Sequence, residues 1–78
     1  MKIKVGQIRQ DCKGMFVITK IGACADGDYI CCIYSDGTTN MSFKEEIYYI
    51  ETSELIAEYN GWLTALNSEE FKNNNCNF

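Results

Sequence analysis

The alternation of apolar and polar positions is clearest between residues 28 and 43, where two β-prone runs flank Asp36 and Gly37. An Asp–Gly pair favours a two-residue type I′ hairpin turn, because both central residues of that turn need positive φ. The predicted cross-strand pairs are then Ile30 with Phe43, Cys32 with Met41, and Tyr34 with Thr39. These six side chains share one face, which suits a core. The opposite face carries Tyr29, Cys31, Ile33, Thr38, Asn40 and Ser42.

Two further strands are predicted before the hairpin. The first covers Gln7 to Asp11 and ends at a turn over residues 12–14, and the second covers Met15 to Ile21. The second strand is apolar on both faces, with Phe16 and Ile18 on one and Val17 and Ile21 on the other. A strand covered on both sides is expected where a sheet curls. Two glycines and an aspartate predict a loop over residues 22–27.

The chain after the hairpin is less regular. Residues 43–49 are compatible with a short helical turn around Lys44, Glu45 and Glu46. Over residues 53–66 apolar residues recur at helical spacing, but Asn60 and Gly61 are costly inside a helix. The alternatives are one helix, or a strand over 54–59 followed by a helix over 61–66, and we favour the second.

Capping residues delimit the predicted C-terminal helices. Asn60 is the expected N-cap of the helix over 61–66, and Trp62 is its expected anchor on the sheet. Asn67, with Glu70 three residues later, suggests the start of one more turn that docks Phe71. Residues 73–78 are expected to form a flexible tail.

Five short strands in about 60 residues predict a mainly β fold, namely a small SH3-like curled sheet or barrel with a short C-terminal helix. That helix would cover an open sheet edge. The chain has 78 residues, so we expect a single β-rich domain over residues 1–72.

Composition and charge narrow the function classes. The hydrophobic share of 46% argues for a folded core. No apolar run reaches the roughly 20 residues of a membrane helix, and no apolar signal core opens the chain, so we expect a cytoplasmic protein with no membrane partner. The net charge of −4 is concentrated in residues 40–78, which disfavours nucleic acid as a direct partner.

Candidate chemistry is sparse. There is no histidine, and no glycine-rich phosphate loop occurs, so we expect no enzymatic activity. Five cysteines permit a zinc site as an alternative, built from Cys12, Cys24 and one of Cys31 or Cys32. No Cys-x-x-Cys pair aims two sulfurs at one ion, and neighbours in a strand point to opposite faces. We therefore expect packing cysteines and no cofactor.

A binding surface is the favoured functional interpretation. Aromatic anchors in a polar setting supply much of the energy of protein interfaces. The expected contacts are Tyr29, Ile33 and Asn40 on the hairpin, together with Tyr48. An acidic patch of Glu45, Glu46, Glu51, Glu54 and Glu58 is expected beside them. The alternative is that the C-terminal helix or a second protomer, in a homodimer, covers Tyr29 and Ile33.

A family resemblance adds to this pattern. It rests on Val5-Gly6-Gln7-Ile8, the hairpin at Asp36-Gly37, Glu54-Leu55-Ile56-Ala57-Glu58-Tyr59, and then Trp62, Ala65, Asn67-Ser68 and Glu70-Phe71. With these features the chain resembles small uncharacterised proteins of phages and prophages of Gram-positive bacteria over most of residues 5–72. Proteins of that group often carry a proline or polar residue before the tryptophan, where this chain has Asn60-Gly61. The resemblance implies a mobile-element origin and a role in countering host machinery, and it assigns no active site.

The expected function is therefore that of a non-enzymatic interaction module. It would bind and inhibit a host protein or nucleoprotein complex, as anti-defence or anti-CRISPR proteins do, with the acidic patch occupying a basic nucleic-acid channel. The alternatives are a zinc-bound structural module and a small nucleic-acid-binding barrel that stacks bases on its tyrosines.

Overall fold

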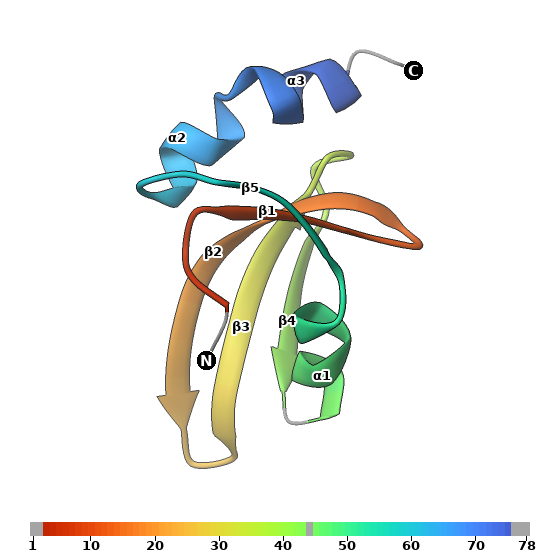
Figure 1. Ribbon diagram of the computed structural model, residues 1–78. Coiled ribbons are helices and arrows are strands. Elements are labelled where there is room, and N and C mark those ends of the chain that lie inside the picture. Colours follow the sequence, from red (N-terminus) through yellow and green to blue (C-terminus); the bar gives the residue numbers. More distant parts are fainter. Residues whose placement is uncertain (1–2, 44, 76–78) are drawn as a thin grey trace.

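A computed structural model of the chain describes residues 3–43 and 45–75 (Figure 1). The elements in chain order are β1 (Gln7–Asp11), β2 (Gly14–Cys24), β3 (Gly27–Tyr34), β4 (Thr39–Phe43), α1 (Glu45–Glu51), β5 (Glu54–Glu58), α2 (Trp62–Leu66) and α3 (Glu69–Asn75).

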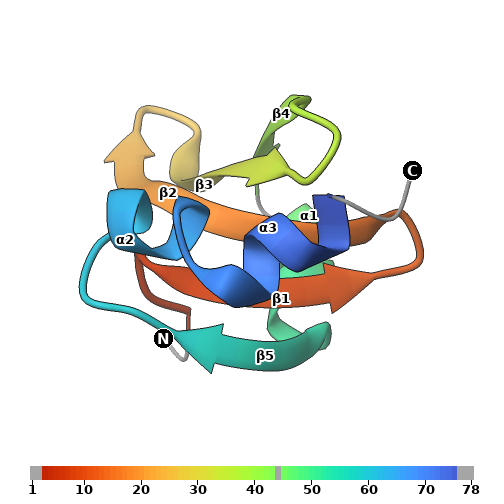
Figure 2. The same ribbon diagram turned by 90° about the horizontal axis from the view of Figure 1, so that it is seen from above.

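The five strands form one antiparallel sheet in the order β4-β3-β2-β1-β5. The sheet curls strongly, so that β1 and β5 cross above the long β2–β3 hairpin, but it does not close, and β4 and β5 remain its edges (Figures 1 and 2). The predicted mainly β fold with a five-stranded curled sheet is confirmed, in its open form.

Helices cover the two faces of the sheet and create two apolar clusters. One cluster lies under α1 and comprises Ile3, Phe16, Ile18, Ile30, Cys32, Ile47 and Ile50. The other lies under α2 and α3 and comprises Ile8, Val17, Ala65 and Phe71. Because successive side chains of a strand point to opposite faces, β2 contributes to both clusters, as its two-sided apolar pattern predicted.

A bulge corrects the prediction for one β2 residue. The β2–β3 register shifts between Ile18 and Lys20, which leaves Thr19 without an opposite residue. The extra residue reverses the alternation beyond it. Ile21 therefore packs against the same cluster as Ile18, and not on the face of Val17, where we expected it.

The register predicted for the β3–β4 hairpin is wrong by one residue. Tyr29 lies opposite Phe43 and Cys32 lies opposite Asn40, because the turn holds three residues, 35–37, instead of two. The Tyr34 amide donates to the Thr38 carbonyl (2.8 Å), and the Tyr34 carbonyl accepts from the Gly37 amide (2.9 Å). Gly37, at φ 90°, supplies the left-handed residue of such a three-residue loop.

This one-residue difference in register places the side chains of β4 on the opposite faces from those predicted. Ser42, with 3% of its surface exposed, lies on the inner side with Cys32, whereas Met41 is 50% exposed. A one-residue change of register moves every side chain of a strand to the other face. Met41 and Phe43, predicted for the core, thus lie on the outer face, and Asn40 and Ser42 lie on the inner one.

The β2–β3 hairpin is longer than predicted. β2 continues to Cys24 and β3 begins at Gly27, so the loop predicted over 22–27 shrinks to residues 25 and 26. Gly22 lies opposite Tyr29, whose ring occupies the space that a side chain at position 22 would need. A glycine that marked a loop in the sequence instead makes room for an aromatic ring within the sheet.

The C-terminal half follows the favoured alternative of strand then helix. The N-cap of α2 is Gly61, without a side-chain hydrogen bond, so the cap predicted at Asn60 is wrong. Asn67 closes α2 by donating to the Leu63 carbonyl (3.0 Å), and Ser68, not Asn67, accepts from the Phe71 amide at the start of α3 (3.4 Å).

Burial also changes the predicted anchor of these helices. Trp62 is 37% exposed, whereas Ala65 and Phe71 are buried against the sheet. The predicted tail over residues 73–78 overlaps the end of α3 at residues 73–75, and residues 76–78 lie outside the described part of the chain.

A buried arginine fixes the end of α1 to β1. The Arg9 guanidinium, 4% exposed, donates to the carbonyls of Ile50 (3.1 Å) and Ser53 (2.8 Å) and to the Gln7 side chain (3.0 Å). A helix C-terminus presents unpaired carbonyls and a partial negative charge, which a guanidinium satisfies well. Burial lowers the pKa of Arg9, and the charges of Glu58 and Glu51 oppose that shift. This contact positions α1 beside the inner face of the sheet.

Candidate functional site

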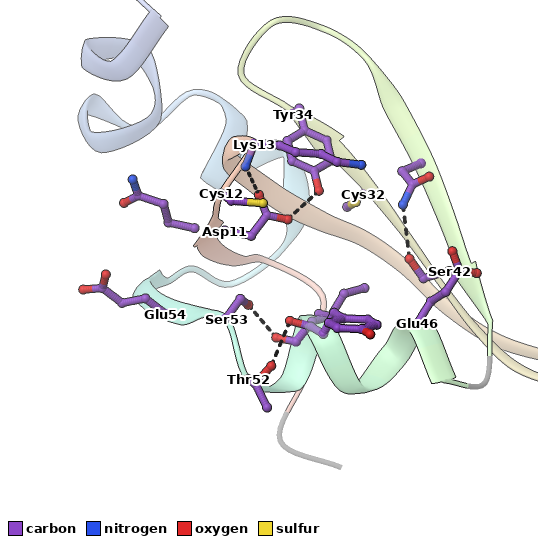
Figure 3. A pocket seen from close by; sticks show the side chains of 14 residues that line it. Asp11, Cys12, Lys13, Cys32, Tyr34, Ser42, Glu46, Thr52, Ser53 and Glu54 are labelled. Atoms are coloured by element: carbon purple, nitrogen blue, oxygen red, sulfur yellow. Dashed lines mark hydrogen bonds between the residues drawn. The ribbon is translucent and has the colours of Figure 1, made fainter.

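A cavity of about 520 Å³ lies between α1 and the inner face of the sheet (Figure 3). It is bounded by the β1–β2 turn, the inner side of β3 and β4, α1 and the start of β5. The lining residues are Gln10, Asp11, Cys12, Lys13, Cys32, Tyr34, Asn40, Ser42, Glu46, Tyr49, Ile50, Thr52, Ser53 and Glu54.

Asp11, the last residue of β1, lines the cavity with a carboxylate whose two oxygens both accept hydrogen bonds. One oxygen of Asp11 accepts from the backbone amide of Lys13 (2.8 Å), and the other accepts from the Tyr34 hydroxyl (2.8 Å). Figure 3 shows Asp11 and Tyr34 pointing toward one another. Burial and this hydrogen bond to Asp11 raise the pKa of Tyr34 far above that of a free phenol. The phenol therefore stays protonated and presents its oxygen lone pairs to its surroundings.

The inner wall contains a thiol that does not ionise readily. Cys32 is 1% exposed, and burial raises its pKa to about 11, with smaller contributions from Asp11 and Cys31. A thiol needs a lowered pKa to act as a nucleophile near neutral pH. Cys32 therefore behaves as a small apolar wall residue.

The β4 side of the cavity is polar because of the hairpin register. The Asn40 amide donates to the Ser42 hydroxyl oxygen (3.2 Å). The pairing of β3 with β4 puts both side chains on the inner face, where Figure 3 shows Ser42. Ser42 keeps its own proton for another acceptor. A two-residue turn would have placed Met41 and Phe43 in this position.

On the α1 side, two hydroxyl groups already donate their protons in hydrogen bonds to backbone carbonyls. The Thr52 hydroxyl donates to the Tyr48 carbonyl (3.0 Å), and the Ser53 hydroxyl donates to the Ile50 carbonyl. Each hydroxyl therefore offers lone pairs, not a proton, to a further group. Figure 3 shows Glu46 beside Ser42 on this side. Tyr49, which is 70% exposed, also lines the cavity.

The predicted contact residues separate into two groups. The acidic residues and Tyr48 lie on α1 and β5, and Glu46 and Glu54 reach the cavity together with Asn40. Tyr29 and Ile33 lie on the opposite, outer face of the sheet. The predicted site thus divides between two sides of the molecule, because the turn shifted β4 relative to β3.

On the outer face Tyr29 already has internal partners. Its ring centroid lies 6.1 Å from that of Phe43 and 5.7 Å from the Lys20 ammonium nitrogen. Tyr29 and Ile33 are half-buried, and Met41 beside them is half-exposed. α2 packs on β1 and β2. The Tyr29 ring therefore packs on neighbouring strands, which leaves less of it available for a partner.

The α1–β5 surface is more exposed. Tyr48 and Tyr49 are 64% and 70% exposed, and their rings meet edge to face with centroids 5.8 Å apart. Glu45, Glu46 and Glu51 of α1 and Glu54 and Glu58 of β5 are exposed as well. Within residues 3–43 and 45–75, none of these carboxylates lies within ion-pair distance of a lysine or arginine side chain. Glu58 accepts a hydrogen bond from Gln7 (3.0 Å).

The cysteines do not converge. Cys12 lies in the β1–β2 turn, Cys24 ends β2, and Cys31 and Cys32 point to opposite faces of β3. Among the described residues, no three of Cys, Asp or Glu come together as a metal site would require. The zinc alternative has no geometric support there, and Cys76 lies outside the described residues.

Much of the cavity lining was not predicted from the sequence. Asp11, Tyr34, Ser42 and Thr52 come from four separate segments and carry no spacing signature. The nearest indication was Asp11 before the turn over residues 12–14, which a turn alone explains equally well.

Comparison of the chain with protein-family models, curated proteins and solved structures gives no match. In the described part of the chain, every helix is too short or too polar to cross a membrane.

Proposed function

We propose that the protein is a non-enzymatic binding module whose α1–β5 surface docks on a basic surface of a partner protein. The observation that carries this proposal is that α1 and β5 expose five glutamates, Glu45, Glu46, Glu51, Glu54 and Glu58, together with the two tyrosines of α1. Tyrosine provides large contact area at low entropic cost, and opposite charge on the partner speeds association.

Competition with nucleic acid is the proposed mode of action. A surface that carries several carboxylates on a rigid helix and strand imitates the charge of a phosphate backbone, and a basic channel would bind either one. The resemblance to phage proteins directs the search for the partner to nucleic-acid-binding proteins of a bacterial host.

The first test measures binding to a synthetic lysine-rich peptide of alternating lysine, glycine and serine. We expect affinity to fall at least tenfold between about 50 and 300 mM salt, and double-stranded DNA to compete with the protein for the peptide. Salt-independent binding, or ternary complexes with DNA, would refute the proposal.

Matched charge reversals locate the surface. Glu45→Lys with Glu51→Lys should weaken peptide binding about tenfold, mostly through a slower on-rate. The control is Asp26→Lys with Asp28→Lys at the exposed tip of the β2–β3 hairpin, which changes the net charge equally (Figure 1). Equal effects of the two pairs would show that only the overall charge matters.

A further inference from the structure

We infer that the cavity between α1 and the sheet binds a guanidinium group, supplied by an arginine of the proposed basic partner. The inference deepens the proposed function and rests on it for the source of the arginine. Glu46, Tyr49 and Glu54 belong both to the docking surface and to the cavity lining, so the cavity opens on that surface.

The hydrogen-bonding character of the lining selects the ligand. The hydroxyls of Tyr34, Thr52 and Ser53 all give their protons to internal acceptors. The Ser53 oxygen also accepts from the Arg9 guanidinium (3.4 Å), so lone pairs remain for a ligand on Tyr34 and Thr52, and one remains on Ser53. A ligand rich in N–H donors complements these oxygens, whereas a phosphate or a carboxylate would find no donor on these three groups.

The charge of the lining favours a cation. Among the lining residues Asp11, Glu46 and Glu54 outnumber the base Lys13, so the lining carries a net charge of −2. The Arg9 guanidinium lies next to the lining and is already held by Ile50 and Ser53. Asp11 lies near the middle, Glu46 lies on the α1 side, and Glu54 points outward at one end (Figure 3). Acceptors on opposite walls suit a donor that reaches several directions at once.

Guanidinium fits this arrangement better than ammonium. It is planar, donates five N–H groups in a fixed fork, and stacks on aromatic rings, whereas an ammonium is a compact, strongly hydrated charge. Tyr49 lies at the exposed side of the cavity and provides such a ring. The volume of about 520 Å³ exceeds one side chain, which leaves room for the residues next to the arginine.

The test uses three short peptides that differ at one central position, which is arginine, lysine or citrulline. Each is titrated into the ¹⁵N-labelled full chain. We expect the arginine peptide to shift the amide resonances of Ser42, Thr52 and Ser53, the lysine peptide to bind about fivefold more weakly, and the uncharged citrulline peptide to bind at least tenfold more weakly. Equal binding of the arginine and citrulline peptides, or shifts confined to other regions, would overturn the inference.

Neighbouring residues on α1 provide matched controls. Glu46→Gln should weaken the arginine peptide about fivefold, whereas Glu45→Gln, which removes the same charge from the docking surface but outside the cavity, should weaken it clearly less. Likewise Tyr49→Leu should weaken the arginine peptide clearly more than Tyr48→Leu does. Equal effects within either pair would overturn the inference. If the Glu45 and Glu51 reversals act on the lysine-rich peptide while these pairs show no contrast, the docking surface stands and only the arginine site fails.

Discussion

Replacing Arg9 by methionine tests how firmly the buried guanidinium connects α1 to the sheet. The variant keeps an unbranched apolar side chain but removes the hydrogen bonds to the Ile50 and Ser53 carbonyls and to Gln7. The Ile50 carbonyl keeps other donors, the Ser53 amide (3.1 Å) and hydroxyl. The loss is therefore concentrated at Ser53, whose carbonyl (2.8 Å) and hydroxyl oxygen (3.4 Å) both accept from Arg9.

The magnitude follows from these partners. Hydrogen bonds to a charged group contribute about 1.5–3 kcal/mol each, and an unpaired buried acceptor costs about 1–3 kcal/mol. The guanidinium also regains hydration on unfolding, as its lowered pKa indicates, and this offsets part of the loss. We expect Arg9→Met to lower the free energy of unfolding by about 2–4 kcal/mol. In a domain of this size the melting temperature would fall by about 10–25 °C.

Urea denaturation followed by far-UV circular dichroism measures the difference directly. Arg9→Lys serves as the control, because it keeps the charge but cannot serve several acceptors in a fork, and we expect a loss of about 1–2 kcal/mol. Hydrogen exchange should quicken most at the end of α1. If Arg9→Met unfolds within about 0.5 kcal/mol of the natural chain, the proposed role of Arg9 is wrong.

Three further predictions concern glycine, pH and thiols. Gly6→Ala should destabilise the fold by at least about 2 kcal/mol more than Gly27→Ala. Both glycines have positive φ, but only at Gly6 would the new Cβ clash with the Tyr59 carbonyl. Equal melting temperatures of the two variants would contradict this prediction. The raised pKa of Tyr34 means that the unfolded chain loses this phenolic proton first, so the free energy of unfolding should fall as the pH rises above about 10, and more steeply than in Tyr34→Phe. Equal slopes in denaturation titrations at pH 9–11 would argue against the raised pKa, and so against both the burial of Tyr34 and its hydrogen bond to Asp11. With a pKa of about 11 and full burial, Cys32 should react with a disulfide reagent only after urea is added, and Cys32→Ala should remove that delayed thiol while leaving the rapid ones unchanged.

The sequence predicts the number of strands and their order along the chain, from β-prone runs in β2, β3 and β4 and from the flanking glycine and turn in β1. β5 was only the favoured one of two alternatives, because its apolar residues also fit helical spacing. The failures arise where a single residue decides between two faces. Asp36 and Gly37 are compatible with a two-residue or a three-residue turn, because both use glycine at positive φ. Met41 and Phe43 are apolar, and only the two-residue turn places them on the core face. The prediction followed that apolar pattern and was therefore wrong about the turn.

A cavity explains why the correct register tolerates polar residues. The inner side of β4 meets a partly open space under α1, so Asn40 and Ser42 need not be apolar. Similarly, no local pattern distinguishes Thr19 as a bulged residue, and the effect of the bulge is visible only in the packing of Ile21. The acidic surface could be predicted from the charge of residues 40–78. The cavity could not, because it depends on contacts between distant segments, and no local sequence pattern indicates it.

The pairing of β1 with β5 has a consequence for how the chain folds. Gln7 and Glu58 are neighbours across the sheet although 51 positions separate them. Closing a loop of that length has an entropic cost that adjacent hairpins avoid, and contacts between remote segments slow folding. We expect the β2–β3–β4 meander to assemble early and β5 to dock late. During synthesis on the ribosome, the edge of β1 that pairs with β5 would then stay unpaired until residues 54–58 have emerged. An unpaired strand edge can bind another chain, so we expect a chaperone or a second nascent chain to bind at β1 during this interval.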